Sequence, residues 1–170
     1  CGDDDPFVSD EQSFSGANSV FIAPDDDLVL YLPEYLTSGK YSIKSMIYVP
    51  AGGNAYYNVM ASFQEPREWA FQVFFNVGGD GSVDAGATAA ATFDFEFDTW
   101  MESKVVVDLN ADWAEYFLDG TLIYAWQWTL GASGGGCALQ LGALDFYGQP
   151  GSDFYFDDMA IYVEDALPAP

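Results

Sequence analysis

Histidine is absent from the 170-residue sequence, and this absence removes whole classes of chemistry. Without an imidazole there are no Ser-His or Cys-His nucleophile pairs, no histidine metal ligands and no imidazole acid–base catalysis. The two cysteines cannot complete a tetrahedral zinc site by themselves. Any enzymatic activity would therefore depend on carboxylates.

Positive charge is nearly absent as well. Only Lys40, Lys44, Arg67 and Lys104 oppose 27 acidic residues, which gives a net charge of -23. Binding to nucleic acid or to an anionic membrane surface needs clustered Lys and Arg, so both are disfavoured. Calcium, saline surroundings or a neutral polymer fit this charge better. The alternative interpretation is that the charge only keeps an exported protein soluble.

Long apolar runs and helical periodicity are also lacking. No run approaches the roughly 20 apolar residues of a membrane-spanning helix, so we expect no membrane insertion. Half of the residues are hydrophobic and 18% are aromatic, which is enough for one domain with its own core. We therefore expect a single domain over residues 1–170. Because the chain opens with Cys1 and not with a signal peptide, we expect it to be either a mature form or a fragment of a larger secreted protein.

The two cysteines leave two interpretations open. Cys1 and Cys137 can form one disulfide that ties the N-terminus to the loop-like Gly-Gly-Gly-Cys segment, and we favour this interpretation. The opening Cys-Gly-Asp-Asp-Asp also resembles the start of a lipid-modified bacterial lipoprotein. Both interpretations predict a secreted, extracellular or cell-surface protein.

Eleven segments have the alternation and the β-branched or aromatic content of strands. They are 18–23, 27–32, 41–50, 55–64, 69–77, 91–98, 104–109, 113–118, 121–128, 138–146 and 153–163. Turn-forming Gly, Pro, Asn and Asp separate them. About a dozen short strands in one domain predict an all-β fold with two antiparallel sheets packed as a sandwich.

The clearest hairpin lies within residues 113–128. Asp119 and Gly120 form a two-residue turn, because both residue types tolerate positive φ. Pairing outward places Trp113 opposite Trp126 and puts both on one face with Trp128. Since both faces of this hairpin are apolar, the second face is buried by a loop, buried by a partner or exposed as an aromatic platform. We favour packing.

Residues 99–128 combine a Trp, a strand that ends in Asp, a short turn and Tyr-Phe-Leu-Asp-Gly. This stretch resembles the concanavalin A-like jelly roll of the laminin-G type. The opening segment 8–22 and the closing segment 154–162 resemble an early strand and the last strand of such domains in large secreted bacterial surface proteins. The resemblance implies a jelly roll that binds glycans, binds proteins or hydrolyses polysaccharides. Many such domains have a further strand before the first one seen here, so a sheet edge would be open.

Three acids alternate with phenylalanines in residues 92–100. Asp94, Glu96 and Asp98 would share one face of a strand, as the catalytic acids of laminarinase-type glycoside hydrolases do. That pattern needs Glu at both outer positions, whereas the outer residues here are Asp94 and Asp98. The pattern favours an acidic outer face over a phenylalanine core, and a glycoside hydrolase is a minor alternative.

Two other acidic segments suggest calcium. Asp108, Asn110 and Asp112 have the spacing of an EF-hand-like loop, but no helices flank them, and we expect a hairpin turn. The adjacent Asp157 and Asp158 resemble the calcium corner of many jelly-roll lectins. We therefore predict these two as candidate ligands of a structural Ca²⁺. A solvated strand start is the alternative.

Alternation along residues 41–77 predicts a sheet face that mixes amides with aromatic rings. Sugars suit such a face, because rings stack on C–H groups and amides hydrogen-bond hydroxyls. A neutral solvated face and a surface for subunit packing are the alternatives. The candidate ligand-binding residues are Tyr56, Asn58, Gln72, Asn76, Trp126 and Trp128.

These observations favour a non-catalytic module that binds a polysaccharide or other glycan, or acts in adhesion. The second hypothesis is a structural subunit that self-associates into an extracellular fibre or surface layer, because an open sheet edge can accept a strand from a neighbour. A carboxylate-dependent glycoside hydrolase is third.

Overall fold

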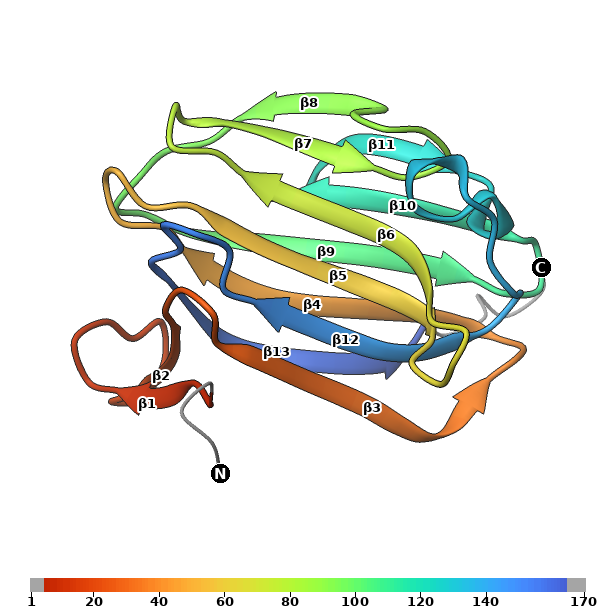
Figure 1. Cartoon of the computed structure of the whole chain (residues 1–170), viewed down its shortest axis with the longest axis horizontal. Helices are drawn as coiled ribbons and strands as arrows, with labels where there is room; N and C mark the ends of the chain where they lie inside the picture. The colour runs from red at the N-terminus through yellow and green to blue at the C-terminus, as the bar shows by residue number, and fades with distance from the viewer. Residues whose placement is uncertain (1–4, 165–170) are drawn as a thin grey trace, which may run out of the picture.

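This computed structural model describes residues 5–164 of the chain. They fold into two antiparallel sheets that pack face to face (Figure 1). The first sheet has seven strands in the spatial order β1 (Phe7–Ser9), β2 (Ser19–Ile22), β13 (Phe154–Val163), β4 (Lys40–Tyr48), β9 (Trp100–Asp108), β10 (Trp113–Leu118) and β11 (Thr121–Trp126). The second has six in the order β3 (Asp27–Leu36), β12 (Leu141–Tyr147), β5 (Ala55–Ser62), β6 (Glu68–Phe75), β7 (Asp80–Asp84) and β8 (Ala91–Asp94). The predicted all-β sandwich is confirmed.

Aromatic side chains from the inner faces of both sheets form much of the core. Phe71 of β6 stacks on Trp126 of β11 with ring centroids 5.4 Å apart, and Phe146 of β12 lies 4.1 Å from Phe156 of β13. Such ring pairs add about 0.5–1.5 kcal/mol each to the gain from burial. Because these contacts cross between the sheets, they fix how the sheets face each other and leave two outer faces.

Two strands were not predicted from the sequence. The strand β1 has only three residues, and β7 begins with Asp80, Gly81 and Ser82, residue types that we expected to form a turn. Gly81 of β7 is required by packing, because a Cβ at this position would overlap the ring of Phe93 on the neighbouring strand β8. The glycine therefore marks a close cross-strand contact and not the end of a strand.

The hairpin of β10 and β11 turns at Asp119 and Gly120 as predicted, both with positive φ. The register beyond the turn differs from the prediction. An irregularity after Phe117 and Leu122 leaves Ile123 unpaired, so Trp126 lies opposite Ala114 and not opposite Trp113. A one-residue bulge moves all later side chains to the other face. Trp126 is therefore in the core. Among the described residues no loop buries the outer face of this hairpin, where Trp113 and Leu122 are exposed.

The connection from β11 to β12 includes two short 3-10 helices, η1 (Trp128–Leu130) and η2 (Ala132–Gly134), and crosses from one sheet to the other (Figure 1). Carboxylates hold it at three points. Asp112 accepts hydrogen bonds from the backbone N–H and hydroxyl of Thr129, Asp84 accepts one from the Ser133 hydroxyl, and Glu68 accepts one from the Ala138 N–H. These bonds fix the loop beside β6.

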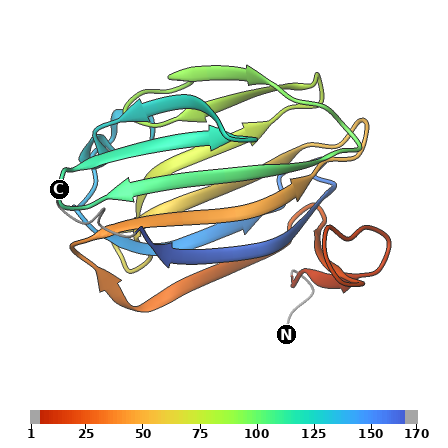
Figure 2. The ribbon, with the colours of Figure 1, turned by 180° about the vertical axis from the view of Figure 1, so that it is seen from behind.

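The sheet edges carry features that oppose strand addition. The edge strand β3 contains Pro33, which has no N–H to donate. On its β13 side, β2 pairs with Phe154–Phe156, and no other strand within residues 5–164 pairs with the rest of that edge of β13 (Figure 2). A register irregularity follows there between Asp157 and Ala160, with Asp158 at positive φ. The open edge expected from the resemblance is therefore present but irregular.

Candidate functional site

The outer face of the six-stranded sheet carries the polar side chains predicted for ligand binding. Asn58 of β5 is paired with Gln72 of β6 on one side and with Asp145 of β12 on the other. Strand alternation directs these three side chains away from the core, on the same face as Tyr56. The structure thus brings Tyr56, Asn58 and Gln72 together, as the sequence pattern predicted.

A chain of hydrogen bonds links these residues across three strands. The Asn58 amide donates to Asp145 Oδ2 at 2.7 Å and to the Tyr56 hydroxyl at 3.1 Å. The Tyr56 hydroxyl donates to Gln72 Oε1 at 2.6 Å. Burial raises the pKa of Tyr56 far above its ordinary value, so its hydroxyl keeps the proton that it donates. Since Asn58 is 0% exposed and Tyr56 is nearly buried, these two residues orient Gln72 and do not themselves reach a ligand.

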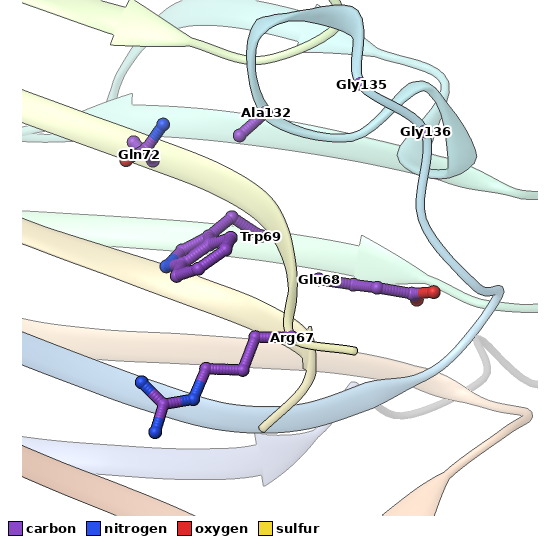
Figure 3. Close-up of a pocket in the computed structure, with 7 residues that line it drawn as sticks. All are labelled: Arg67, Glu68, Trp69, Gln72, Ala132, Gly135 and Gly136. Atoms are coloured by element: carbon purple, nitrogen blue, oxygen red, sulfur yellow. The ribbon is translucent and has the colours of Figure 1, made fainter. Parts of the chain in front are cut away.

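Gln72 lines an open groove of about 530 Å³ at the surface. Its walls are side chains of β6 and the loop after η1, as Figure 3 shows. The lining residues are Arg67, Glu68, Trp69, Gln72, Ala132, Gly135 and Gly136. The Trp69 ring is 39% exposed, and the Gln72 amide nitrogen is directed toward the loop (Figure 3). An aromatic ring and a fixed amide therefore share one groove.

The sequence pattern did not place Trp69 in this groove. Simple alternation along β6 put it on the inner face with Phe71. In the structure Val59 pairs with Phe71, whereas Met60 pairs with Trp69, so Ala70 is an extra residue in β6. This bulge brings Trp69 to the same face as Gln72. No signal in the sequence marks Ala70 as bulged.

Arg67 is the one cation on the six-stranded sheet, because Lys40, Lys44 and Lys104 all belong to β4 or β9 of the other sheet. Its guanidinium lies 5.0 Å from the centroid of the Phe63 ring, and its Nε is 3.5 Å from a Glu65 carboxylate oxygen. The cation–π contact orients the side chain along the outer face. Arg67 therefore supplies hydrogen-bond donors beside the Trp69 ring.

Asp145 is the titratable group below this surface. Burial raises its pKa to about 6, and the neighbouring carboxylate of Asp27 adds to the rise. Its Oδ1 atom and the Oδ1 atom of Asn58 are buried without a hydrogen-bond partner. The negative charge of Asp27 favours the protonated, neutral form of Asp145.

Three of the predicted ligand-binding residues lie elsewhere. Trp126 and Trp128 are 2% and 0% exposed, so the prediction that they contact a ligand is wrong. Trp126 stacks in the core, and the Trp128 indole donates to the Gln140 carbonyl. Asn76 lies in the turn after β6, where its amide donates to Asp80 at 2.9 Å. The structure does not bring Asn76 to the groove.

The predicted calcium ligands make protein hydrogen bonds. Asp157 Oδ2 accepts from the backbone N–H groups of Phe14 and Ser15, and Asp158 Oδ1 accepts from the Ser15 hydroxyl. Asp157 Oδ1 accepts from the Asp158 N–H. Within residues 5–164 no three Asp, Glu or Cys side chains are grouped so that they could hold a metal ion. Three of the four carboxylate oxygens of this corner thus accept protein hydrogen bonds, and a bound Ca²⁺ at Asp157 and Asp158 stays a prediction.

The other acidic segments have structural roles. Phe93 and Phe95 are buried against Phe75, whereas Asp94, Glu96 and Asp98 are exposed, and β8 already ends at Asp94. This agrees with an acidic outer face over a phenylalanine core. Asp108 caps the turn between β9 and β10 by accepting from the Asn110 and Ala111 N–H groups, and Asn110 accepts from Gly39. The expected hairpin turn is confirmed there.

Cys137 lies in the loop that borders the groove. Its sulfur donates to the Trp128 carbonyl at 3.2 Å, and burial raises the pKa of the thiol to about 12. Its predicted disulfide partner, Cys1, lies outside the described residues. The Cys1–Cys137 disulfide therefore stays a prediction.

Comparison with known proteins identifies the fold. No family model matches the sequence, and no curated protein matches it. Among solved structures, the potassium-bound carbohydrate recognition domain of Emp46p has a TM-score of 0.61 at 9% identity, over 93% of this chain and 86% of that one. Alginate lyase AlgAT5 of polysaccharide lyase family 7 has a TM-score of 0.60 at 11% identity, over 98% and 84%.

A third similar structure, a sialidase, has a TM-score of 0.60 at 9% identity, and this chain spans only 16% of its length. At such low identities the likeness identifies the fold alone. The protein is a concanavalin A-like jelly roll, a fold found both in sugar-recognising domains and in sugar-cleaving enzymes. Across the described residues, no helix has the length and apolarity to cross a membrane.

Proposed function

We propose that this protein is a non-catalytic module that binds a neutral glycan in the Trp69 groove. The observation that carries the proposal is the pairing of the exposed Trp69 ring with the fixed Gln72 amide. A ring stacks on the C–H face of a sugar, and an amide donates to its hydroxyls. Because Tyr56 already occupies Gln72 Oε1, the Nε2 group is the part that donates to a ligand.

The charge of the chain favours a neutral ligand. A net charge of -23 repels polyanions, and Arg67, the one cation beside the groove, is already near the Glu65 carboxylate. The sugar-recognising domain of Emp46p, which has the same fold, supports a glycan as the ligand class. Secretion to the extracellular space or the cell surface is part of this proposal, because polysaccharides are abundant there.

We further propose that the groove does not catalyse glycoside hydrolysis. Glycoside hydrolysis usually needs two carboxyl groups that flank the scissile bond. Glu68 is the one acidic residue among the seven that line the groove, and it accepts a hydrogen bond from the Ala138 N–H. Neither reducing ends nor unsaturated products should accumulate when polysaccharides are incubated with the protein. Turnover that Glu68→Gln abolishes would contradict this part of the proposal.

A glycan array with Trp69→Ala tests the binding site. We expect selective binding of the unmodified chain and a loss of about tenfold or more in affinity for the variant. Trp113→Ala is the matched control, because Trp113 is 45% exposed on the other sheet. Binding that is equal in all three proteins, or an array with no signal at all, would refute the proposed site.

The alternative of a fibre subunit has one supporting observation. Tyr162 and Val163 are exposed on the unpaired part of β13, where a strand from a second copy could add. The irregularity after Asp157 and the Pro33 and Glu34 of edge strand β3 oppose regular addition. We rank this alternative second. Sedimentation of the isolated protein at high concentration tests it, because a fibre subunit would form large assemblies.

A further inference from the structure

A second hollow lies on the same outer face, next to the Trp69 groove. It has a volume of about 380 Å³ and lies between β3 and the connection from β5 to β6. Its lining is mostly aromatic and apolar: Tyr31, Leu32, Pro33, Tyr35, Phe63 and Gln64. The Tyr31 side chain is 63% exposed, and its ring is nearly parallel to that of Phe63, with an angle of 7° and centroids 6.2 Å apart.

Arg67 joins the two hollows. It lines the Trp69 groove, and its guanidinium lies over the Phe63 ring that lines the second hollow. In Figure 1 the connection from β5 to β6 passes the end of β12 where that strand begins and reaches toward β3. It therefore lies between the residues that line the Trp69 groove and those that line the second hollow. The outer face therefore presents an aromatic ring on each side of one hydrogen-bond donor.

The second hollow is held by hydrogen bonds. The Tyr35 hydroxyl accepts from the backbone N–H groups of Phe63 and Gln64, each at 3.1 Å. These two bonds tie the β5–β6 connection to β3, the edge strand of the sheet. Such a connection does not need to reorganise when a ligand binds, which lowers the entropic cost of binding.

We infer that the Tyr31 hollow is a second sugar subsite, and that the ligand is an internal segment of an extended neutral polysaccharide that spans both hollows. This inference rests on the proposed function of the Trp69 groove. A single sugar can occupy one hollow only, whereas a linear chain can stack on Trp69, receive hydrogen bonds from Arg67 and stack again at Tyr31. The continuity of the two hollows through Arg67 is the reason to assign them to one ligand.

Titration calorimetry with oligosaccharides of increasing length tests the inference. The probes are cello-, laminari-, manno- and xylo-oligosaccharides, each from the disaccharide to the hexasaccharide. We expect affinity to rise with length in the series that binds. Tyr31→Ala should leave the disaccharide affinity unchanged and lower the hexasaccharide affinity about tenfold. Tyr31→Phe, which keeps the ring, should retain the affinity.

The controls separate this inference from the proposed function. Tyr162→Ala removes a similarly exposed tyrosine from the other sheet and should change nothing. If Trp69→Ala has no effect at any length, the proposed function fails and this inference fails with it. If Trp69→Ala weakens every probe but affinity does not grow with length and Tyr31→Ala has no effect, the second subsite alone is refuted.

Discussion

The outer faces of the two sheets differ in how their exposed aromatic residues are surrounded. On the six-stranded sheet, Trp69 lies beside the fixed amide of Gln72 and the donor groups of Arg67. On the seven-stranded sheet, Trp113 is slightly more exposed. On β10, the strand of Trp113, the Phe117 ring lies under Lys104 of the neighbouring strand β9. Lys44 pairs with Glu102 at 2.7 Å. The two faces therefore differ less in the exposure of their rings than in the donors beside them, and our proposal of a binding face rests on the donors.

The seven-stranded sheet also carries a row of rings, and its own chain covers part of that row. Phe7, Phe21, Tyr155, Tyr48 and Trp100 follow one another across β1, β2, β13, β4 and β9, with successive centroids between 4.8 and 6.0 Å apart. The 10–18 loop packs on this row: Phe14 lies against Trp100, and Glu11 accepts a hydrogen bond from Tyr155. Phe7, at the edge of the row, stays exposed. The loop thus covers the middle of this row, whereas the Trp69 groove is open.

We expect the largest difference in stability between the two faces when the Asn58 amide is removed, because this amide holds Tyr56 and, through it, Gln72. Asn58→Ala leaves Asp145 Oδ2 without its buried donor and removes the bond that the Tyr56 hydroxyl accepts, so we expect a loss of about 2 kcal/mol in the free energy of unfolding. Lys44→Met breaks an exposed ion pair on the other face and should cost less than about 1 kcal/mol. Urea denaturation measures both. Equal losses would mean that the hydrogen-bond chain contributes no more to the free energy of unfolding than the ion pair does.

The two faces should also differ in how the free energy of unfolding depends on pH, because Asp145 lies on the six-stranded sheet. The ordinary pKa of Asp145 is 3.8, and the folded protein raises it to about 6, first by burial. Between these values the folded state retains a proton that the unfolded chain releases. The free energy of unfolding should therefore fall as the pH rises from about 4 to about 6 and level off above that range.

Urea denaturation of Asp145→Asn across this range isolates the contribution of Asp145, because the variant has no carboxyl group at this position. We expect a flatter profile than that of the unmodified protein. Glu102→Gln on the other face should leave the fall in place. A fall that persists unchanged in Asp145→Asn would assign it to another group.

A smaller effect is expected where the 10–18 loop covers the seven-stranded sheet. Asp157→Ala removes the acceptor of the Phe14 and Ser15 N–H groups, both near the surface, and should cost about 1 kcal/mol. The variant should also bind more of a hydrophobic dye as the aromatic row becomes exposed, without gaining glycan binding.

Calcium and a chelator should leave the melting temperature of the unmodified protein unchanged. A rise with calcium that is absent in Asp157→Ala would restore the calcium corner.

The fold could be predicted from the sequence because its main signals are local. Alternation marked eleven of the strands, and Asp119 and Gly120 fixed a hairpin turn by their tolerance of positive φ. Alternation also grouped Tyr56, Asn58 and Gln72 on one face, where the structure has them. Signals of this kind involve residues close together in the chain, so no tertiary information was needed.

The site could be predicted only in part, because two bulges changed the faces of key residues. The extra residue Ala70 brings Trp69 out of the predicted inner face, and unpaired Ile123 places Trp126 in the core. Neither residue is unusual in its segment. The loop wall of the groove depends on Asp84, Asp112 and Glu68, which are distant in sequence from the loop that they hold. Such long-range contacts have no local signature.

The loop wall of the groove can accept a new side chain without a change in either sheet. Gly131 cannot accept a side chain, because a Cβ there would lie 2.7 Å from the backbone of Gly136. Gly135 differs: it has φ -76° and ψ -11°, which any L-residue adopts, and a Cβ would meet only the Ala132 carbonyl oxygen at 3.4 Å. Replacing Gly135 would add new chemistry at the rim while the anchoring carboxylates stay in place. This position is therefore a natural starting point for diversification, whether by evolution or by engineering.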